Sequence, residues 1–149
     1  MITKGFVRTR RFALAALTAA GVSIAHADMQ AARQALSEGD YAQAQSKFKE
    51  YIAAYPGSPH TPAAMIGEAA CLDALGQADQ AITAYQKVAT SFANSAEALD
   101  AKMAIAVIHE GREEWKEAHK LYDEISATTL ASSLKGDATM MKMRLERDH

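Results

Sequence analysis

The histidines and acidic residues of the stretch 109–119 are the first candidates for chemistry in this sequence. His109 and His119 could share a metal ion, and the carboxylates around them could act as an acid and base pair. A spacing of ten residues does not put two histidines on one helix face, and Gly111 lies between them. Acidic side chains are also favoured in the first turn of a helix. We therefore interpret both histidines as structural and the acidic run as a helix start. The acidic residues are Glu110, Glu113, Glu114 and Glu117.

The remaining reactive side chains also have structural explanations. The lone Cys71 lies in an apolar stretch, Ala70-Cys71-Leu72, where a cysteine acts as a small buried hydrophobe. The methionines at 140, 141 and 143 could suggest copper binding, but their helical setting favours core and cap packing. The sequence carries no G-x-S-x-G, H-E-x-x-H or phosphate-binding glycine motif. We expect no enzyme activity, no metal and no cofactor.

The composition predicts helices as the elements that position these side chains. The chain has 33 alanines among 149 residues, with only three prolines and eight glycines. Alanine loses no side-chain entropy in a helix, so the composition favours an all-α fold over a β-sandwich. The length is that of one domain, and a single cysteine excludes an intrachain disulfide.

Residues 1–27 have the three parts of a secretory signal peptide. They contain four basic and no acidic residues, an uncharged run from Phe12 to Ile24, and a closing Ala25-His26-Ala27. The run is too short to span a membrane, which needs about 20 residues. We expect cleavage after Ala27 and a periplasmic location. The pair Arg10-Arg11 leaves open whether export follows the general secretory or the twin-arginine route.

Removal of this segment makes the chain acidic. Residues 28–149 hold 12 basic and 18 acidic residues, which gives a net charge of −6. Such a charge is poorly suited to phosphate backbones or anionic lipids. We expect no nucleic-acid partner and no membrane insertion of this part.

A period of 37 residues runs through the chain from residue 28. Small, aromatic and serine positions all recur at this one shift, which chance matches between alanines would not produce. The aligned sets are Ala32, Ala69 and Ala106; Ala44, Ala81 and Ala118; Phe48, Tyr85 and Tyr122; Ser58, Ser95 and Ser132. Three units result, at residues 28–58, 59–95 and 96–132.

Each unit reads as two amphipathic helices joined by a tight turn. Gly39 predicts a left-handed end of the first helix, and Asp40 predicts the N-cap of the second. Pro56 and Pro59 then end the unit, since proline cannot continue a helix. A helical pattern at 132–148 predicts one further helix that caps the last pair.

These residues resemble the pattern of the tetratricopeptide repeat family. The first unit matches it at Gly39-Asp40-Tyr41, Ala44, Phe48 and Pro56, and the second at Gly76, Ala81 and Tyr85. The third unit departs from the pattern because its Gly111 comes two residues early. The resemblance implies a short right-handed α-solenoid over residues 28–149.

The unit boundaries are similar to those of periplasmic repeat proteins of the bacterial envelope. The boundary Tyr55-Pro56-Gly57-Ser58-Pro59 resembles the Tol–Pal-associated protein and, more distantly, the repeat lipoprotein of the outer-membrane assembly machine. The chain lacks the coiled coil of the first and the lipidated cysteine of the second. The resemblance implies an envelope interaction module without catalysis.

In this family the first helix of each pair supplies a concave groove for a peptide or partner protein. We therefore expect an adaptor that binds a protein or peptide partner in this groove. The alternative is a self-associating structural subunit of an envelope complex, a homo-oligomer that uses no peptide groove. The groove positions that the resemblance implies are Arg33, Leu36, Ile66, Ala70, Asp73, Met103, Val107 and Glu110.

Overall fold

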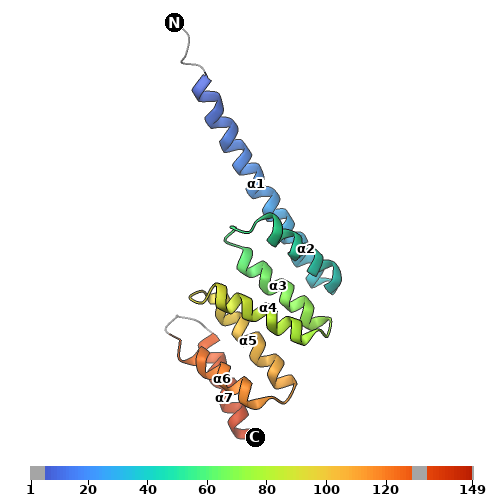
Figure 1. The fold of residues 1–149 in the computed structure, drawn as a ribbon, viewed down its shortest axis with the longest axis vertical. Helices are drawn as coiled ribbons and strands as arrows, with labels where there is room; N and C mark the ends of the chain where they lie inside the picture. Colours follow the sequence, from blue (N-terminus) through green and yellow to red (C-terminus); the bar gives the residue numbers. More distant parts are fainter. Residues whose placement is uncertain (1–5, 129–133, 149) are drawn as a thin grey trace.

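The computed structural model describes residues 6–128 and 134–148, which form seven α-helices and no strand. The helices follow one another as an elongated array, with the N-terminal part of the first helix projecting from one end (Figure 1). Their bounds are α1 (Phe6–Ser37), α2 (Tyr41–Ala54), α3 (Thr61–Ala74), α4 (Ala78–Ser91), α5 (Ala96–Gly111), α6 (Trp115–Ser126) and α7 (Leu134–Asp148).

Every helix packs on the next one along the chain, and the odd-numbered helices also contact one another. No such contact joins α2 to α4 or α4 to α6 within the described residues. The odd helices therefore form the inner, closely spaced side of the array, and the even helices form the outer side. The all-α solenoid predicted from the repeat pattern is confirmed.

The 37-residue period places equivalent residues in equivalent packing sites. The alanines of both aligned sets are fully buried, and each set recurs in all three helix pairs. The aromatic residue four positions after the second alanine is buried each time in a cluster formed by its own pair and the following helix. Small side chains let paired helices approach, and the aromatic ring fills the adjacent space. The aromatic residues are Phe48, Tyr85 and Tyr122.

The turns within the first two pairs have the predicted left-handed glycines. Gly39 has φ of 80° and Gly76 has φ of 75°. Asp40 caps α2 as expected, because its carboxylate accepts the backbone N–H of Gln43 at 3.0 Å.

The third turn has the same shape without a glycine. Glu113, 37 residues after Gly76, takes φ of 62°, while Gly111 is the last residue of α5. The same two backbone hydrogen bonds close all three turns. In each turn two successive backbone N–H groups donate to carbonyl oxygens of the preceding helix. The donors and acceptors are Gly39 to Leu36 and Asp40 to Ala35 in the first turn, Gly76 to Asp73 and Gln77 to Leu72 in the second, and Glu113 to Glu110 and Glu114 to His109 in the third.

A close approach between α2 and α3 depends on Gly67, which the sequence analysis did not single out. A Cβ atom at this position would lie 2.6 and 2.7 Å from two ring carbons of Phe48, and closer still to Cζ. The ring of Phe48 therefore occupies the space that a side chain at 67 would need.

The two ends of the chain extend the repeat pattern. Helix α1 continues without a break through the expected cleavage position after Ala27, and the structure does not test that cleavage. Helix α7 packs on α6 as the predicted cap, with Ala138 and Leu145 buried. Ser132 of the aligned serine set lies outside the described residues. No helix in the described part of the chain is long and apolar enough to cross a membrane.

Candidate partner-binding surface

The groove positions implied by the repeat resemblance all lie on the odd helices. Two lie on the C-terminal half of α1, three on α3 and three on α5. Within α3 and α5 they are spaced i, i+4 and i+7, which places them on one helix face. Because neighbouring odd helices contact one another, these faces join into one surface. We call this surface the odd-helix face.

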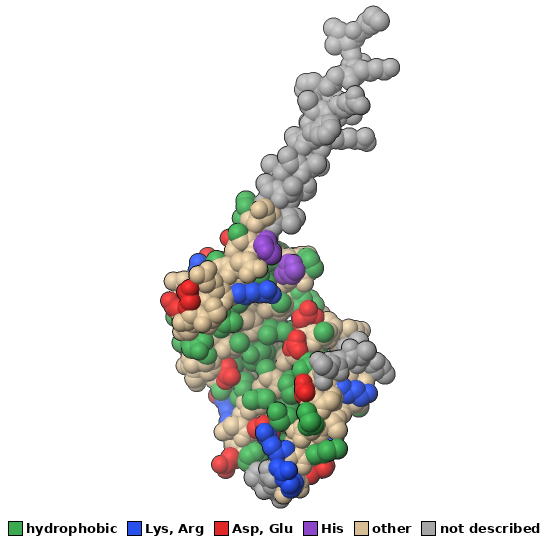
Figure 2. All heavy atoms as spheres, turned by 180° about the vertical axis from the view of Figure 1, so that it is seen from behind, with side chains coloured by type: hydrophobic (Ala, Val, Ile, Leu, Met, Phe, Trp, Pro, Cys, Tyr) green, Lys and Arg blue, Asp and Glu red, His purple; other side chains and the backbone are tan. Residues whose placement is uncertain are grey.

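Partly exposed apolar side chains form the middle of the odd-helix face. Val107 is 48% exposed, while Ile66, Ala70 and Met103 are half-buried beside it. Met140 of α7 follows Met103 by 37 residues and is 65% exposed. We call these five residues the inner stripe. Figure 2, the view from behind, shows hydrophobic side chains gathered down the middle of the repeat body.

Met140 is a functional candidate that the sequence analysis placed in the cap. The signal for it was present, because Met140 occupies the same register as Ile66 and Met103. The helical setting of the methionines in this segment favours packing, and the groove positions that the resemblance implies end at Glu110 on α5.

Glu110 lies at the C-terminal end of the stripe and joins α5 to α7. Its side chain is only 12% exposed, and Arg144 Nη2 donates to its two carboxylate oxygens at 2.8 and 2.9 Å. Burial and, after it, the nearby Glu110 carboxylate raise the pKa of Tyr122 on α6 to about 12. Glu110 therefore has a structural role in holding the last helix.

Asp73 is the repeat equivalent of Glu110 and remains exposed. Burial raises the pKa of Tyr85 to about 12, with Asp73 as the next contributor, so the tyrosine and acid recur together. In the first pair, Phe48 stands in place of the tyrosine and Leu36 stands in place of the acid. Leu36 packs against the apolar core of that pair.

Arg33 is exposed on α1, four residues after the buried Met29. The structure thus brings the apolar groove positions of α3 and α5 together as one band. It places Arg33 and Leu36 at the N-terminal end of the same face.

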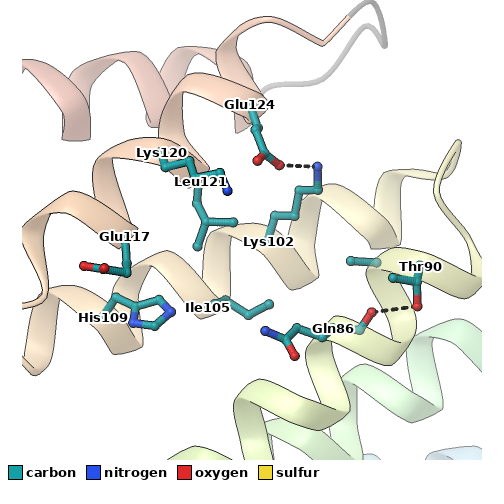
Figure 3. Close-up of a pocket in the computed structure, with 10 residues that line it drawn as sticks. Gln86, Thr90, Lys102, Ile105, His109, Glu117, Lys120, Leu121 and Glu124 are labelled. Atoms are coloured by element: carbon teal, nitrogen blue, oxygen red, sulfur yellow. Dashed lines mark hydrogen bonds and ion pairs between the residues drawn. The ribbon is translucent and has the colours of Figure 1, made fainter.

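The outer side carries a separate cavity of about 250 Å³ between α4, α5 and α6 (Figure 3). Ile105 and Leu121 are the apolar residues labelled in it, and Lys102 pairs with Glu124 at 2.8 Å beside them. A similar cavity lies one repeat earlier, between α2, α3 and α4. This recurrence indicates spaces left between successive even helices. None of the eight expected groove residues lines either cavity.

The two histidines considered for metal binding have different neighbours. His109 Nδ1 lies 2.5 Å from Glu114 Oε2 at the turn between α5 and α6. His119 lies between α6 and α7, where each ring nitrogen is 3.2 Å from a carboxylate oxygen, one of Asp123 and one of Glu146. No group of three metal-ligating side chains occurs among the described residues.

Cys71 is buried, as the sequence analysis predicted, and burial raises the pKa of its thiol. A thiolate is the reactive form, so this cysteine is held in its unreactive state.

The odd-helix face, with its exposed apolar side chains, is therefore the candidate site.

Residues 35–105 match the family model of the tetratricopeptide repeat. This segment runs from the end of α1 into α5 and includes both glycine turns. This part of the chain is similar to tetratricopeptide repeats. The same register continues through α6 and α7, so the repeat array extends to the described C-terminal helix. No curated protein sequence matches the chain.

Several solved structures share the fold of this helical array. PcrH from Pseudomonas aeruginosa has a TM-score of 0.68 and 16% identity, over 83% of this chain and 92% of that one. The Yersinia enterocolitica type III secretion chaperone SycD, in complex with a peptide of the translocator YopD, has a TM-score of 0.65 and 18% identity, over 83% and 92%. An alternative dimer of SycD has a TM-score of 0.68 and 18% identity, over 85% and 94%.

At these identities the similarity shows the fold alone. SycD is a type III secretion chaperone, and repeats of a kinesin light chain share the fold as well. Nothing in these structures supports the expected resemblance to the Tol–Pal-associated or outer-membrane assembly proteins.

Proposed function

We propose that this protein is an adaptor that binds a segment of a partner protein on the odd-helix face. The inner stripe carries the proposal, because it presents apolar side chains of the neighbouring odd helices α3, α5 and α7 on one exposed surface. Contiguous exposed apolar surface in a soluble protein is typical of an interaction site. The complex of the similar chaperone SycD with a translocator peptide supports a peptide as the partner. The proposal includes no catalytic activity and no cofactor.

A peptide library displayed on phage tests this function directly. The bait is the chain from Asp28 onward, and each selected peptide is then measured against Val107→Asp. Val107 is the most exposed apolar residue of the stripe on α5, so a charge there removes an apolar contact and leaves the core intact. We expect the variant to lose the selected peptides.

Leu75→Asp is the matched control for this experiment. Leu75 is an exposed apolar residue, 40% accessible, at the C-terminal end of α3 outside the stripe. The control variant should bind the peptides like the wild type. Peptides that bind Val107→Asp as tightly as wild type would place the site elsewhere and contradict the proposal.

The proposal also includes export to the cell envelope, which rests on residues 1–27. The charged start, uncharged run and Ala25-His26-Ala27 end support secretion, and the boundary sequence near Pro56 supports an envelope role similar to Tol–Pal-associated proteins. N-terminal sequencing of the protein from a periplasmic fraction should give Asp28 as the first residue. Recovery of the intact chain, starting at Met1, only from the cytoplasm would contradict this part.

Self-association is the second candidate function. Met143 of α7 is 62% exposed at a position whose equivalents, Ala69 and Ala106, are covered by the second helix of their pair. The open end of the array could therefore receive a second copy, and a similar chaperone forms a dimer. Size-exclusion chromatography with light scattering distinguishes the adaptor from the self-associating subunit, because the adaptor proposal expects a monomer. If the wild type is a dimer, Met143→Gln should convert it to a monomer.

A further inference from the structure

Three acidic side chains lie beside the inner stripe, at the N-terminal ends of α5 and α7. Asp100 precedes Met103 by three residues, and Asp137 precedes Met140 by three. Residues three apart are neighbours on a helix surface, so both carboxylates border the stripe on the same side. Glu97 lies one turn before Asp100 on α5. We call these three residues the acidic edge. In Figure 2 acidic side chains lie next to the hydrophobic band.

The chain itself does not neutralise this edge. None of the ion pairs among the described residues includes Glu97, Asp100 or Asp137. Partial burial, together with the charge of Glu97, raises the pKa of Asp100 above its ordinary value. Lys135, the lysine nearest to Asp137 in sequence, donates instead to the carbonyl of Thr128 at 3.2 Å.

At the C-terminal end of the stripe on α5 the acid is already paired, whereas its repeat equivalent on α3, Asp73, is exposed. Glu110 receives two hydrogen bonds from Arg144, and this pair joins α5 to α7. Between α5 and α7 the face is thus asymmetric, with an apolar middle, unpaired carboxylates at the N-terminal ends of both helices and one ion pair at Glu110.

Helix capping explains only part of the acidic edge. Glu97 and Asp137 lie in the first turns of their helices, where a negative charge stabilises the helix dipole. Asp100 lies in the second turn of α5, beyond that effect, and is the carboxylate next to Met103. Positive charges from outside would pair with these side chains.

We propose that the occupant of the odd-helix face is a basic amphipathic peptide segment of the partner. Its apolar side chains lie on the inner stripe, and its lysine or arginine side chains face Glu97, Asp100 and Asp137. This assignment rests on the proposed adaptor function and adds the chemistry of the bound segment. Charge complementarity of this kind determines specificity and association rate.

The composition of the library-selected peptides is the first test. Peptides that bind wild type but not Val107→Asp should be enriched in lysine and arginine over aspartate and glutamate. One such peptide is then synthesised and titrated against wild type and against the double variant Asp100→Asn, Asp137→Asn. We expect its Kd to rise about 3- to 10-fold, and added salt to weaken wild-type binding more than binding by the variant.

Glu117→Gln is the matched control, because Glu117 is an exposed acid in the first turn of α6 on the outer side. It should leave the Kd unchanged, and thermal melting checks that every variant is folded. Selected peptides that are acidic or uncharged, or a Kd unaffected in the double variant, would overturn the inference. The adaptor function would still stand in that case, as long as Val107→Asp abolishes binding.

Discussion

The backbone at Glu113 shows how a single residue can hold a repeat turn without the usual glycine. A side chain in the left-handed region costs roughly 1–2 kcal/mol, because its Cβ approaches the neighbouring carbonyl oxygen. Two backbone hydrogen bonds and the contact of His109 with Glu114 close the turn around this residue. The third pair therefore keeps the geometry of the first two at the cost of local strain.

Replacement of this residue should stabilise the protein. We expect Glu113→Gly to raise the free energy of unfolding by about 1 kcal/mol, since glycine adopts the φ of 62° without the Cβ contact. Urea unfolding followed by circular dichroism measures the change. Glu117→Gly, the same substitution inside α6, should lower stability by roughly 0.5–1 kcal/mol instead. Equal effects of both substitutions would show that the turn at 113 is not strained.

Gly67 is the residue at which an added methyl group should do the most damage. Gly67→Ala places a Cβ against the buried ring of Phe48, and overpacking of this kind costs about 1–3 kcal/mol. Thermal unfolding measures the loss, and the additional change Phe48→Leu should recover part of it. Gly136→Ala in α7, where nothing lies near the new Cβ, is the control and should not destabilise. A Gly67→Ala protein as stable as Gly136→Ala would contradict this packing.

At the scale of the elements, α7 is held on α6 by charges as well as by its apolar face. Lys142 Nζ donates to Asp123 Oδ1 at 2.5 Å, and His119 contacts Asp123 and Glu146. The hydrogen bond from Lys142 lowers the pKa of Asp123, and the same bond raises the pKa of Lys142. The last helix is therefore the element whose attachment depends most on pH.

The two pKa shifts predict a pH range for the attachment of α7. The lowered pKa of Asp123 gives a stabilisation that is present above the ordinary value of 3.8 and is lost as the pH falls below it. The raised pKa of Lys142 gives a second stabilisation, which is present below the ordinary lysine value of 10.5 and is lost as the pH rises further. Hydrogen exchange of α7 amides, corrected for intrinsic rates, should therefore show less protection at about pH 3 than at about pH 6.

Asp123→Asn separates this effect from general acid unfolding. The variant should lose protection in α7 at about pH 6 while α3 exchanges as in the wild type. Unchanged protection of α7 in the variant would mean that its apolar contacts alone hold the helix.

The helix pairs and their register could be predicted from the sequence, because a fixed period marks equivalent residues. Gly39 and Gly76 indicated the turns, and buried alanines recur where the period placed them. The pair of Glu110 with Arg144 could not be predicted, since it joins residues 34 apart whose distance depends on how α7 docks. The approach of Phe48 to Gly67 depends in the same way on the crossing of two helices.

At the scale of the whole molecule, the chain is a linear array in which each pair depends on its neighbours. Each helix contacts the next helix along the chain, and each odd helix also contacts the next odd one, while no contact joins α1 to α5 among the described residues. The stability of such an array is approximately a sum over units and their interfaces. The middle pair, α3 and α4, therefore links both ends, and the odd-helix face spans the pairs that it links.

Ala81 is the position that tests this linkage. It is fully buried where α4 crosses its partner, in register with Ala44 and Ala118. We expect Ala81→Leu to lower the free energy of unfolding by about 1–3 kcal/mol, because three added carbons do not fit a close helix contact. Leu at the exposed neighbour Gln80 should change stability by no more than about 0.5 kcal/mol. Thermal melting measures both variants.

Hydrogen exchange should also show reduced protection of α2 and α5 in Ala81→Leu, since the damaged pair contacts both neighbours. A loss confined to α4 would show that the pairs are stable independently and that the array does not act as one linked unit.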